Sequence, residues 1–223
     1  MPVSRMLNTL SADHKPTFLK RHSTALRVWH WLLFLAISGS MITVLLNSTV
    51  LKSRHNVSLV QTELARSGVA VTSDQARGVA REFSDKIWLV HKIFGYTLIF
   101  FLLSRLVIEF SQPSGEKIFD RIRKAVGFYR EPELKTFYRH YLAVRYGYLA
   151  FYVLLTLMAI TGLVLAYEDV GFLKGIHETA KVIHEYGQYL LYAYVVLHVG
   201  GVILSELGTE KGLVSGMIHG KYP

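Results

Sequence analysis

Four long apolar runs constrain this chain more than any other feature of its sequence. They cover residues 26–46, 87–110, 146–167 and 182–204, and each is nearly free of charged side chains. A helix needs about 20 mainly apolar residues to cross the hydrocarbon core of a bilayer. Within that core the backbone N–H and C=O groups must be paired inside the protein, as they are in a helix. The runs therefore predict an all-α protein, a four-helix transmembrane bundle with up-down-up-down order.

The composition agrees with one membrane domain that comprises residues 1–223, since 51% of the residues are hydrophobic. The chain has no cysteine, which excludes disulfides, cysteine-ligated iron–sulfur clusters and thioether-attached haem. The formal net charge is +9. Beside membrane helices, Lys and Arg set the topology and contact anionic lipid. We therefore expect membrane lipid, and not nucleic acid, as the partner of this charge.

The distribution of Lys and Arg also predicts the orientation of the chain. More of these residues flank the runs on the side of the two termini than on the opposite side. Because cytoplasmic loops carry the excess of positive charge, both termini are expected in the cytoplasm. The first run lacks a cleavage site of small residues, so we interpret it as a retained anchor and not as a signal peptide.

Two loops carry further patterns. The outer loop, residues 47–86, is too long for a plain turn, and its second half is predicted to form a helix that Ser73 caps and that leads into the second span. This loop is either a packing lid or a docking surface for an outer partner. The inner segment, residues 115–130, is either a solvated charged loop or an amphipathic helix in the headgroup layer. The helix would present one apolar face made of Ile118, Phe119, Ile122 and Val126.

Four of the ten histidines lie inside the apolar runs: His30, His91, His184 and His198. Polar side chains are costly in hydrocarbon, so they usually face the interior of a bundle and have a function. Taken singly, each of these histidines could equally well form a hydrogen bond between helices.

The depths of these histidines favour a more specific interpretation. Fourteen residues of helix separate His184 from His198 by about 21 Å, and both rings point from nearly the same face. Because successive spans run in opposite directions, His30 reaches the depth of His198 near the inner surface. By the same reasoning, His91 reaches the depth of His184 near the outer surface. The sequence therefore predicts two cross-bundle pairs, His30 with His198 and His91 with His184.

A pair of imidazoles suits haem better than a bare metal ion. Zinc usually requires four ligands, whereas a haem iron requires only two axial ligands because the porphyrin supplies four nitrogens. Ligation by two histidines leaves no open position, which favours electron transfer over oxygen binding. We therefore expect two haem b groups, with the four histidines as the axial ligands of their irons.

Three further residues are candidates for haem binding. Arg105 follows His91 by fourteen residues on the same face and could pair with haem propionates, or it could reach the inner headgroups. Lys92 could serve the outer haem. Gly95, one turn after His91, could admit a flat macrocycle or allow close contact between helices.

The sequence segments around these residues resemble those of a known protein family. The segments RVWHWLLF around His30 and LVHKIFGY around His91, the IHE…LH pair at His184 and His198, and the tail GLVSGMIHGKY resemble the bacterial cytochrome b561 family. The likeness is strongest to its hydrogenase-type b cytochrome subunits, which are related to formate dehydrogenase gamma subunits. It implies two b-type haems held by the first, second and fourth helices, in the bacterial cytoplasmic (inner) membrane. It also implies electron transfer between membrane quinone and an outer-side redox protein or partner subunit. The outer loop is longer than the family leads one to expect, which leaves the identity of that partner open.

Three functions are therefore compatible with the sequence. The first is the electron-transfer subunit of a membrane oxidoreductase. The second is a self-contained cytochrome b561-type quinone oxidoreductase that acts on superoxide or a small donor. The third is a haem-free membrane anchor or a proton-relay bundle, in which the histidines would be hydrogen-bonded or would pass protons. The sequence identifies neither the donor, nor the direction of electron flow, nor the residues of a quinone site.

Overall fold

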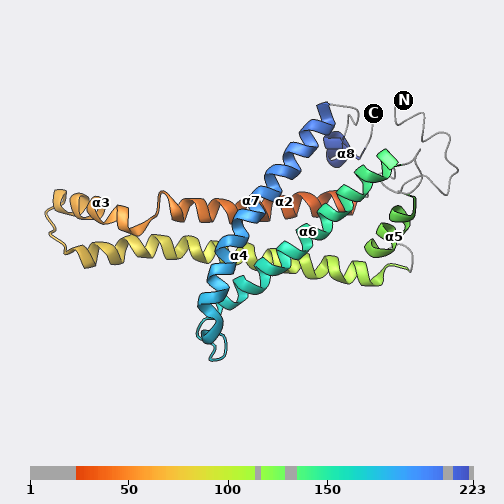
Figure 1. The fold of residues 1–223 in the computed structure, drawn as a ribbon. Coiled ribbons are helices and arrows are strands. Elements are labelled where there is room, and N and C mark those ends of the chain that lie inside the picture. The colour runs from red at the N-terminus through yellow and green to blue at the C-terminus, as the bar shows by residue number, and fades with distance from the viewer. Residues whose placement is uncertain (1–23, 114–116, 129–134, 208–212, 221–223) are drawn as a thin grey trace. The chain divides into compact units, whose positions relative to one another are not determined.

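The computed structural model describes residues 24–113, 117–128, 135–207 and 213–220. Within these ranges the regular structure is entirely helical (Figure 1). The elements in chain order are α2 (Thr24–Ser48), α3 (Ser53–Arg66), α4 (Ser73–Ser111), α5 (Ile118–Phe128), α6 (Lys135–Ala166), the short 3₁₀ helix η3 (Lys174–Ile176), α7 (His177–Leu207) and α8 (Leu213–His219).

Four of the described segments are long and apolar enough to cross a membrane. They are Thr24–Ser48, Ser73–Ser111, Tyr141–Ala166 and Lys174–Leu207. Many of their large apolar side chains are exposed, for example Leu197 at 75%. Such a surface is stable against lipid chains but not against water. The predicted all-α transmembrane class is confirmed.

Helix α4 is much longer than the apolar run it contains. Its 39 residues would extend about 58 Å, whereas the hydrocarbon core of a bilayer is about 30 Å thick. The helix includes residues 73–86, so this part of the predicted outer loop continues directly into the second span. Helix α3 supplies the other regular element of that loop, and α5 lies within the predicted inner segment 115–130.

The chain divides into two compact units. One contains the start of α2 up to His30 and the chain from Leu102 onward, and the other is Trp31–Phe101. That residues 1–223 form one domain stays a prediction.

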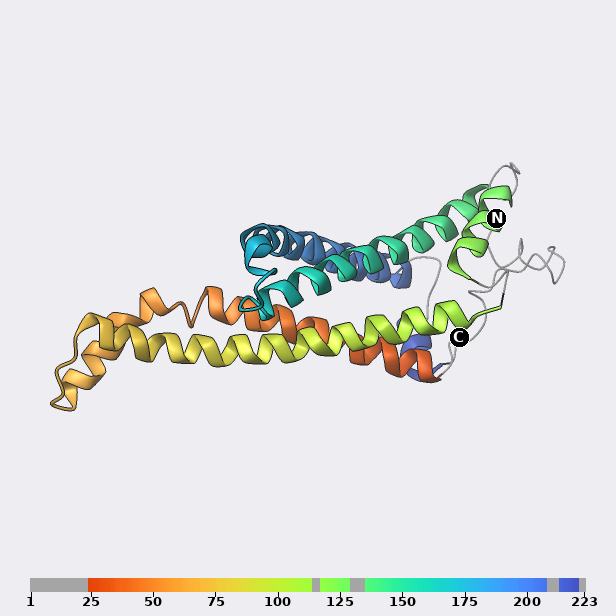
Figure 2. The same cartoon turned by 90° about the horizontal axis from the view of Figure 1, so that it is seen from below.

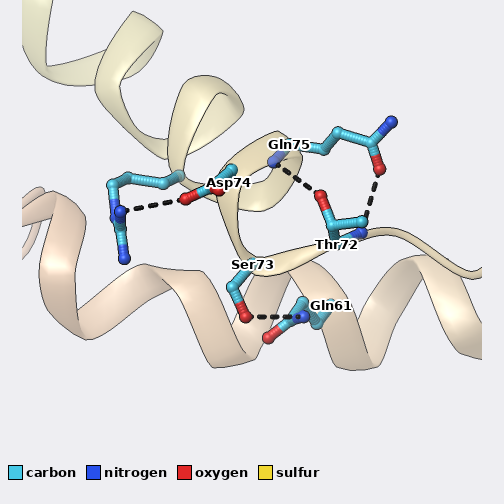
Figure 3. Close-up of polar contacts among 6 residues, drawn as sticks. Gln61, Thr72, Ser73, Asp74 and Gln75 are labelled. Carbon is cyan, nitrogen blue, oxygen red and sulfur yellow. Dashed lines mark hydrogen bonds and ion pairs between the residues drawn. The ribbon is translucent and has the colours of Figure 1, made fainter.

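In the second unit, a capping box starts α4 beside α3 (Figure 3). The backbone N–H of Thr72 donates to Gln75 Oε1 at 2.9 Å, and the N–H of Gln75 donates to Thr72 Oγ1 at 3.2 Å. This reciprocal pairing satisfies two N–H groups that a helix start otherwise leaves free. Gln61 of α3 reaches the same turn and bonds Ser73 Oγ at 3.4 Å. The capping residue is therefore Thr72, and Ser73, which the sequence suggested, is instead the first residue of the helix.

In the same unit, α2 and α4 approach each other closely where the ring of Phe94 packs over Gly39. A β carbon built on Gly39 would lie 2.3 Å from Cζ of Phe94, so the ring occupies the space that any other residue would need. Small residues allow membrane helices to approach closely in this way. Near the end of α2, Asn47 Nδ2 donates to the carbonyl of Ser84 at 3.3 Å.

In the first unit, α6 and α7 form an antiparallel pair, which Figures 1 and 2 both show. The rings of Phe151 and Tyr194 lie 5.2 Å apart between the two helices. Met158 Sδ packs over Gly187, where a β carbon would lie at 2.7 Å. Helix α5 packs against α6 and has Ile122 and Ala125 buried.

Two glutamates connect the ends of long helices to the short helices that follow. Glu109 of α4 accepts the backbone N–H of Ile118, the first residue of α5. Glu206 of α7 accepts the N–H of Val214 in α8 at 3.1 Å. A carboxylate at a helix start satisfies a free N–H and interacts favourably with the helix dipole.

We expect Glu109→Ala to loosen the start of α5, because the N–H of Ile118 loses its carboxylate acceptor. Loss of such a cap costs about 1 kcal/mol, so the first amides of α5 should exchange with deuterium about fivefold faster. Hydrogen exchange followed by mass spectrometry measures this effect. Glu206→Ala is the matched control, since it should affect α8 and leave α5 unchanged. Equal exchange at α5 in wild type and Glu109→Ala would contradict the capping role.

Candidate functional site

The four histidines of the apolar runs lie in three helices. His30 is in α2, His91 is in α4, and both His184 and His198 are in α7. Because α7 is continuous between its two histidines, the helical rise separates them by about 21 Å along the axis. One helix therefore contributes an imidazole at each of two levels.

The first unit brings His30 and His198 together. Their ring centres lie 6.4 Å apart, and the ring planes are tilted by 53°. Two imidazoles that ligate one metal ion from opposite sides, each through a bond of about 2 Å, have ring centres about 6 Å apart. The spacing of this pair therefore fits one axial ligand on each face of a haem. Tyr194, one turn before His198, lies parallel to its ring at 6.2 Å and 4°.

His184 lies against α6 within the same unit. Its Nδ1 is 2.8 Å from Oγ1 of Thr161, a residue that is only 5% exposed. A β carbon built on Gly162 would lie 3.3 Å from Cε1 of His184. The absence of a side chain at Gly162 therefore lets the imidazole approach α6 closely.

His91 has an equivalent partner in the second unit. Its Nδ1 is 2.9 Å from Oγ1 of Thr43, which is 4% exposed, and 3.3 Å from the carbonyl of Ser40. The ring of Trp88 meets the imidazole edge-on at 5.4 Å. His91 and His184 belong to different units, so their pairing stays a prediction.

Arg105 takes part in a polar network inside the first unit. Its guanidinium forms an ion pair with Glu109 at 3.3 Å, and its Nε donates to the hydroxyl of Tyr152 at 3.2 Å. The Arg105 side chain is 26% exposed. These contacts hold the guanidinium at a fixed place on α4, and its contact with a haem propionate stays a prediction.

The other two candidates lie close to His91 in sequence. Lys92 is exposed, and Gly95 has no atom within 4 Å of where its β carbon would be, among the residues that the structure describes. Gly95 therefore has room beside it, as the approach of a flat ligand requires. The roles of both residues in haem binding stay predictions.

Within the described ranges, no group of three or more His, Asp or Glu side chains could hold a metal ion. A haem requires only two protein ligands, so pairs of histidines suffice.

A comparison with protein-family models tests the resemblance of the histidine segments to known proteins. The model of one family, prokaryotic cytochrome b561, matches residues 21–220.

The chain belongs to the prokaryotic cytochrome b561 family. Its resemblance to that family, inferred above from the segments around the histidines, is confirmed. No curated protein and no solved structure gave a match. As a member of this family, the chain is a membrane b-type cytochrome that binds b-type haem and takes part in electron transfer.

Sequence reasoning missed several polar residues around the histidines of this cytochrome. Thr43 and Thr161 are not among the residues that the sequence patterns single out. The sequence does contain one signal for these threonines, which is that they are polar residues inside apolar runs. Such side chains tend to face protein and not lipid. The helical pattern does not tell which histidine each polar side chain meets.

Proposed function

We propose that this cytochrome binds two haem b groups and carries electrons across the bacterial cytoplasmic membrane, between the quinone pool and a redox partner on the outer side. The observation that supports this most directly is the pair of imidazoles of His30 and His198, with ring centres 6.4 Å apart. The same helix, α7, presents His184 about 21 Å further along its axis. A cytochrome with haem at two such levels is suited to moving electrons across the bilayer.

Each part of the proposed site has a distinct role. His30 and His198 would hold one haem, and His91 and His184 the other. Arg105 would pair with propionates at the level of His198, and Lys92 at the level of His91. Gly95 would leave room for the macrocycle.

When bound, haem supplies reversible one-electron chemistry. The chain contributes the axial imidazoles, their orientation and an apolar surrounding that tunes the potential. Ligation by two histidines occupies both axial positions, so the protein favours electron transfer over binding of small ligands. The excess of Lys and Arg on the side of the termini supports a cytoplasmic location for both termini.

The haem count tests the central claim. We expect the purified chain to show a reduced b-type spectrum and two haem b groups per chain by the pyridine haemochrome assay. One haem per chain, or none, would contradict the proposal. His55→Ala is a suitable control, because His55 lies in α3, outside the four candidate spans.

A second measurement separates an electron-transfer subunit from a self-contained enzyme. In vesicles that contain only this chain, we expect electrons from an external reductant to reach a trapped acceptor. We also expect no turnover of quinone with superoxide or a small soluble donor. Such turnover by the chain alone would instead support the self-contained quinone oxidoreductase.

A further inference from the structure

Two buried threonines hold the two histidines at the proposed outer level in the same way. Thr43 bonds Nδ1 of His91 at 2.9 Å in one unit, and Thr161 bonds Nδ1 of His184 at 2.8 Å in the other. The threonines are 4% and 5% exposed. Both contacts join different helices, and both involve the same ring nitrogen.

The hydroxyl proton of each threonine is already directed to its own helix. Thr43 Oγ1 donates to the carbonyl of Ser40 at 2.6 Å, and Thr161 Oγ1 donates to the carbonyl of Leu157 at 2.8 Å. Such bonds to a preceding carbonyl are common for threonine in helices. A hydroxyl has one proton and two lone pairs. A threonine whose hydroxyl donates to its own helix accepts from the imidazole, and Nδ1 of the histidine then carries the proton.

The contact between His91 and Ser40 supports the same protonation state. The carbonyl of Ser40 lies 3.3 Å from Nδ1 of His91 and the Ser40 hydroxyl lies 3.4 Å from it. The carbonyl can only accept, whereas the hydroxyl can donate or accept. In a neutral imidazole with a proton on Nδ1, the other nitrogen, Nε2, has the free lone pair. A metal binds a nitrogen that has a lone pair, and the hydrogen bond of the opposite nitrogen fixes which one this is.

We propose that Thr43 and Thr161 are positioning residues that lock His91 and His184 in the Nδ1–H tautomer, so that each presents Nε2 to haem iron. This inference rests on the proposed function, in which these two histidines are axial ligands. The hydroxyl groups also increase the basicity of the ligand, because an accepted Nδ1–H bond shifts electron density toward Nε2. The two threonines thereby stabilise the ferric state relative to the ferrous state.

The test uses the full chain with Thr161→Val and Thr43→Val, which keep the side-chain shape but remove the hydroxyl. We expect Thr161→Val to weaken haem retention at this level about tenfold. A tenfold loss of affinity that affects only ferric haem raises the reduction potential of the haem by about 59 mV, because the couple transfers one electron. Thr43→Val should have a smaller effect, because the Ser40 carbonyl can still accept from His91. Redox titration followed by the haem absorbance measures these shifts.

Matched variants separate this role from a general packing role. Thr161→Ser and Thr43→Ser keep the hydroxyl and should restore the potential and the haem content. Thr156→Val and Thr97→Val are the controls, since these threonines donate to the carbonyls of Tyr152 and Ile93 in their own helices. If Thr161→Val and Thr43→Val behave like these controls, the positioning role is overturned while the haem assignment stands.

A measurement on haem-free protein distinguishes a failure of the positioning role from a failure of the proposed function. In haem-free protein with ¹⁵N-labelled histidine, we expect Nδ1 of His91 and His184 to carry the proton, with His91→Gln and His184→Gln identifying the signals. The Thr→Val variants should increase the Nε2–H tautomer. Protonation at Nε2 in the wild type would overturn the positioning role. A chain that binds no haem would instead overturn the proposed function, whatever the tautomer.

Discussion

Replacing His198 with alanine will remove one of the two proposed haems and stop electron transfer across the membrane. The imidazole of His198 lies opposite that of His30, with ring centres 6.4 Å apart, and alanine has no group that can ligate iron. The pyridine haemochrome assay should fall from two haem groups per chain to one. In vesicles with a trapped acceptor, the rate should drop to that of vesicles without protein. A purified His198→Ala variant with two haem groups per chain would show that the ligand assignment is wrong.

The four single histidine variants together test the pairing. His30→Ala and His198→Ala should remove the same component of the reduced spectrum, whereas His91→Ala and His184→Ala should remove the other. His219→Ala is a further control, because His219 lies at the end of α8 and outside the candidate spans. Loss of different components in His30→Ala and His198→Ala would refute their pairing, even if each variant lost one haem.

Gly39→Ala should strongly destabilise the packing of α2 on α4, although it adds a single methyl group. That methyl group would lie 2.3–2.7 Å from three atoms of the Phe94 ring, far inside van der Waals contact. The ring must move or the helices must separate, which costs about 1–3 kcal/mol for an overpacked site. Thr43 contacts His91 across the same two helices, so this displacement should also lower the haem content. Thermal unfolding in detergent and the haem-to-protein ratio measure both effects.

Gly78→Ala is the matched control for this substitution. Gly78 lies in α4, and a β carbon there would meet nothing within 4 Å in the part of the chain that the structure describes. In a helix with free space, alanine in place of glycine should stabilise by about 0.5–1 kcal/mol. The change Phe94→Leu should reduce the cost of Gly39→Ala, because leucine lacks the outer part of the ring. If the cost of Gly39→Ala is the same in the wild-type and Phe94→Leu backgrounds, the ring is not its cause.

Much of the architecture could be predicted from the sequence, for a simple reason. Membrane helices need long apolar runs, and those runs are visible as four separate windows. The fixed rise of a helix then gives the depth of each histidine in its span, which led to the expectation of two levels. The segments around His30, His91, His184 and His198 also carried the family resemblance that the family model confirms.

The threonine partners of His91 and His184 could not be predicted in this way. Thr43 is 48 residues from His91, and Thr161 is 23 residues from His184. Helical periodicity shows which side chains share a face, but not how a neighbouring helix is rotated against that face. The approach of Phe94 to Gly39 and the hydrogen bond from Arg105 to Tyr152 depend on that rotation.

The sequence by itself determined an all-α membrane cytochrome with histidines at two depths, because apolar length and helical rise are properties of a single helix. The depths of His30 and His198 predicted that these two residues pair, and the tertiary structure places their ring centres 6.4 Å apart. Only the tertiary structure decided that a buried threonine contacts each of His91 and His184. Contacts between helices depend on how side chains interlock, and interlocking is settled when the helices pack.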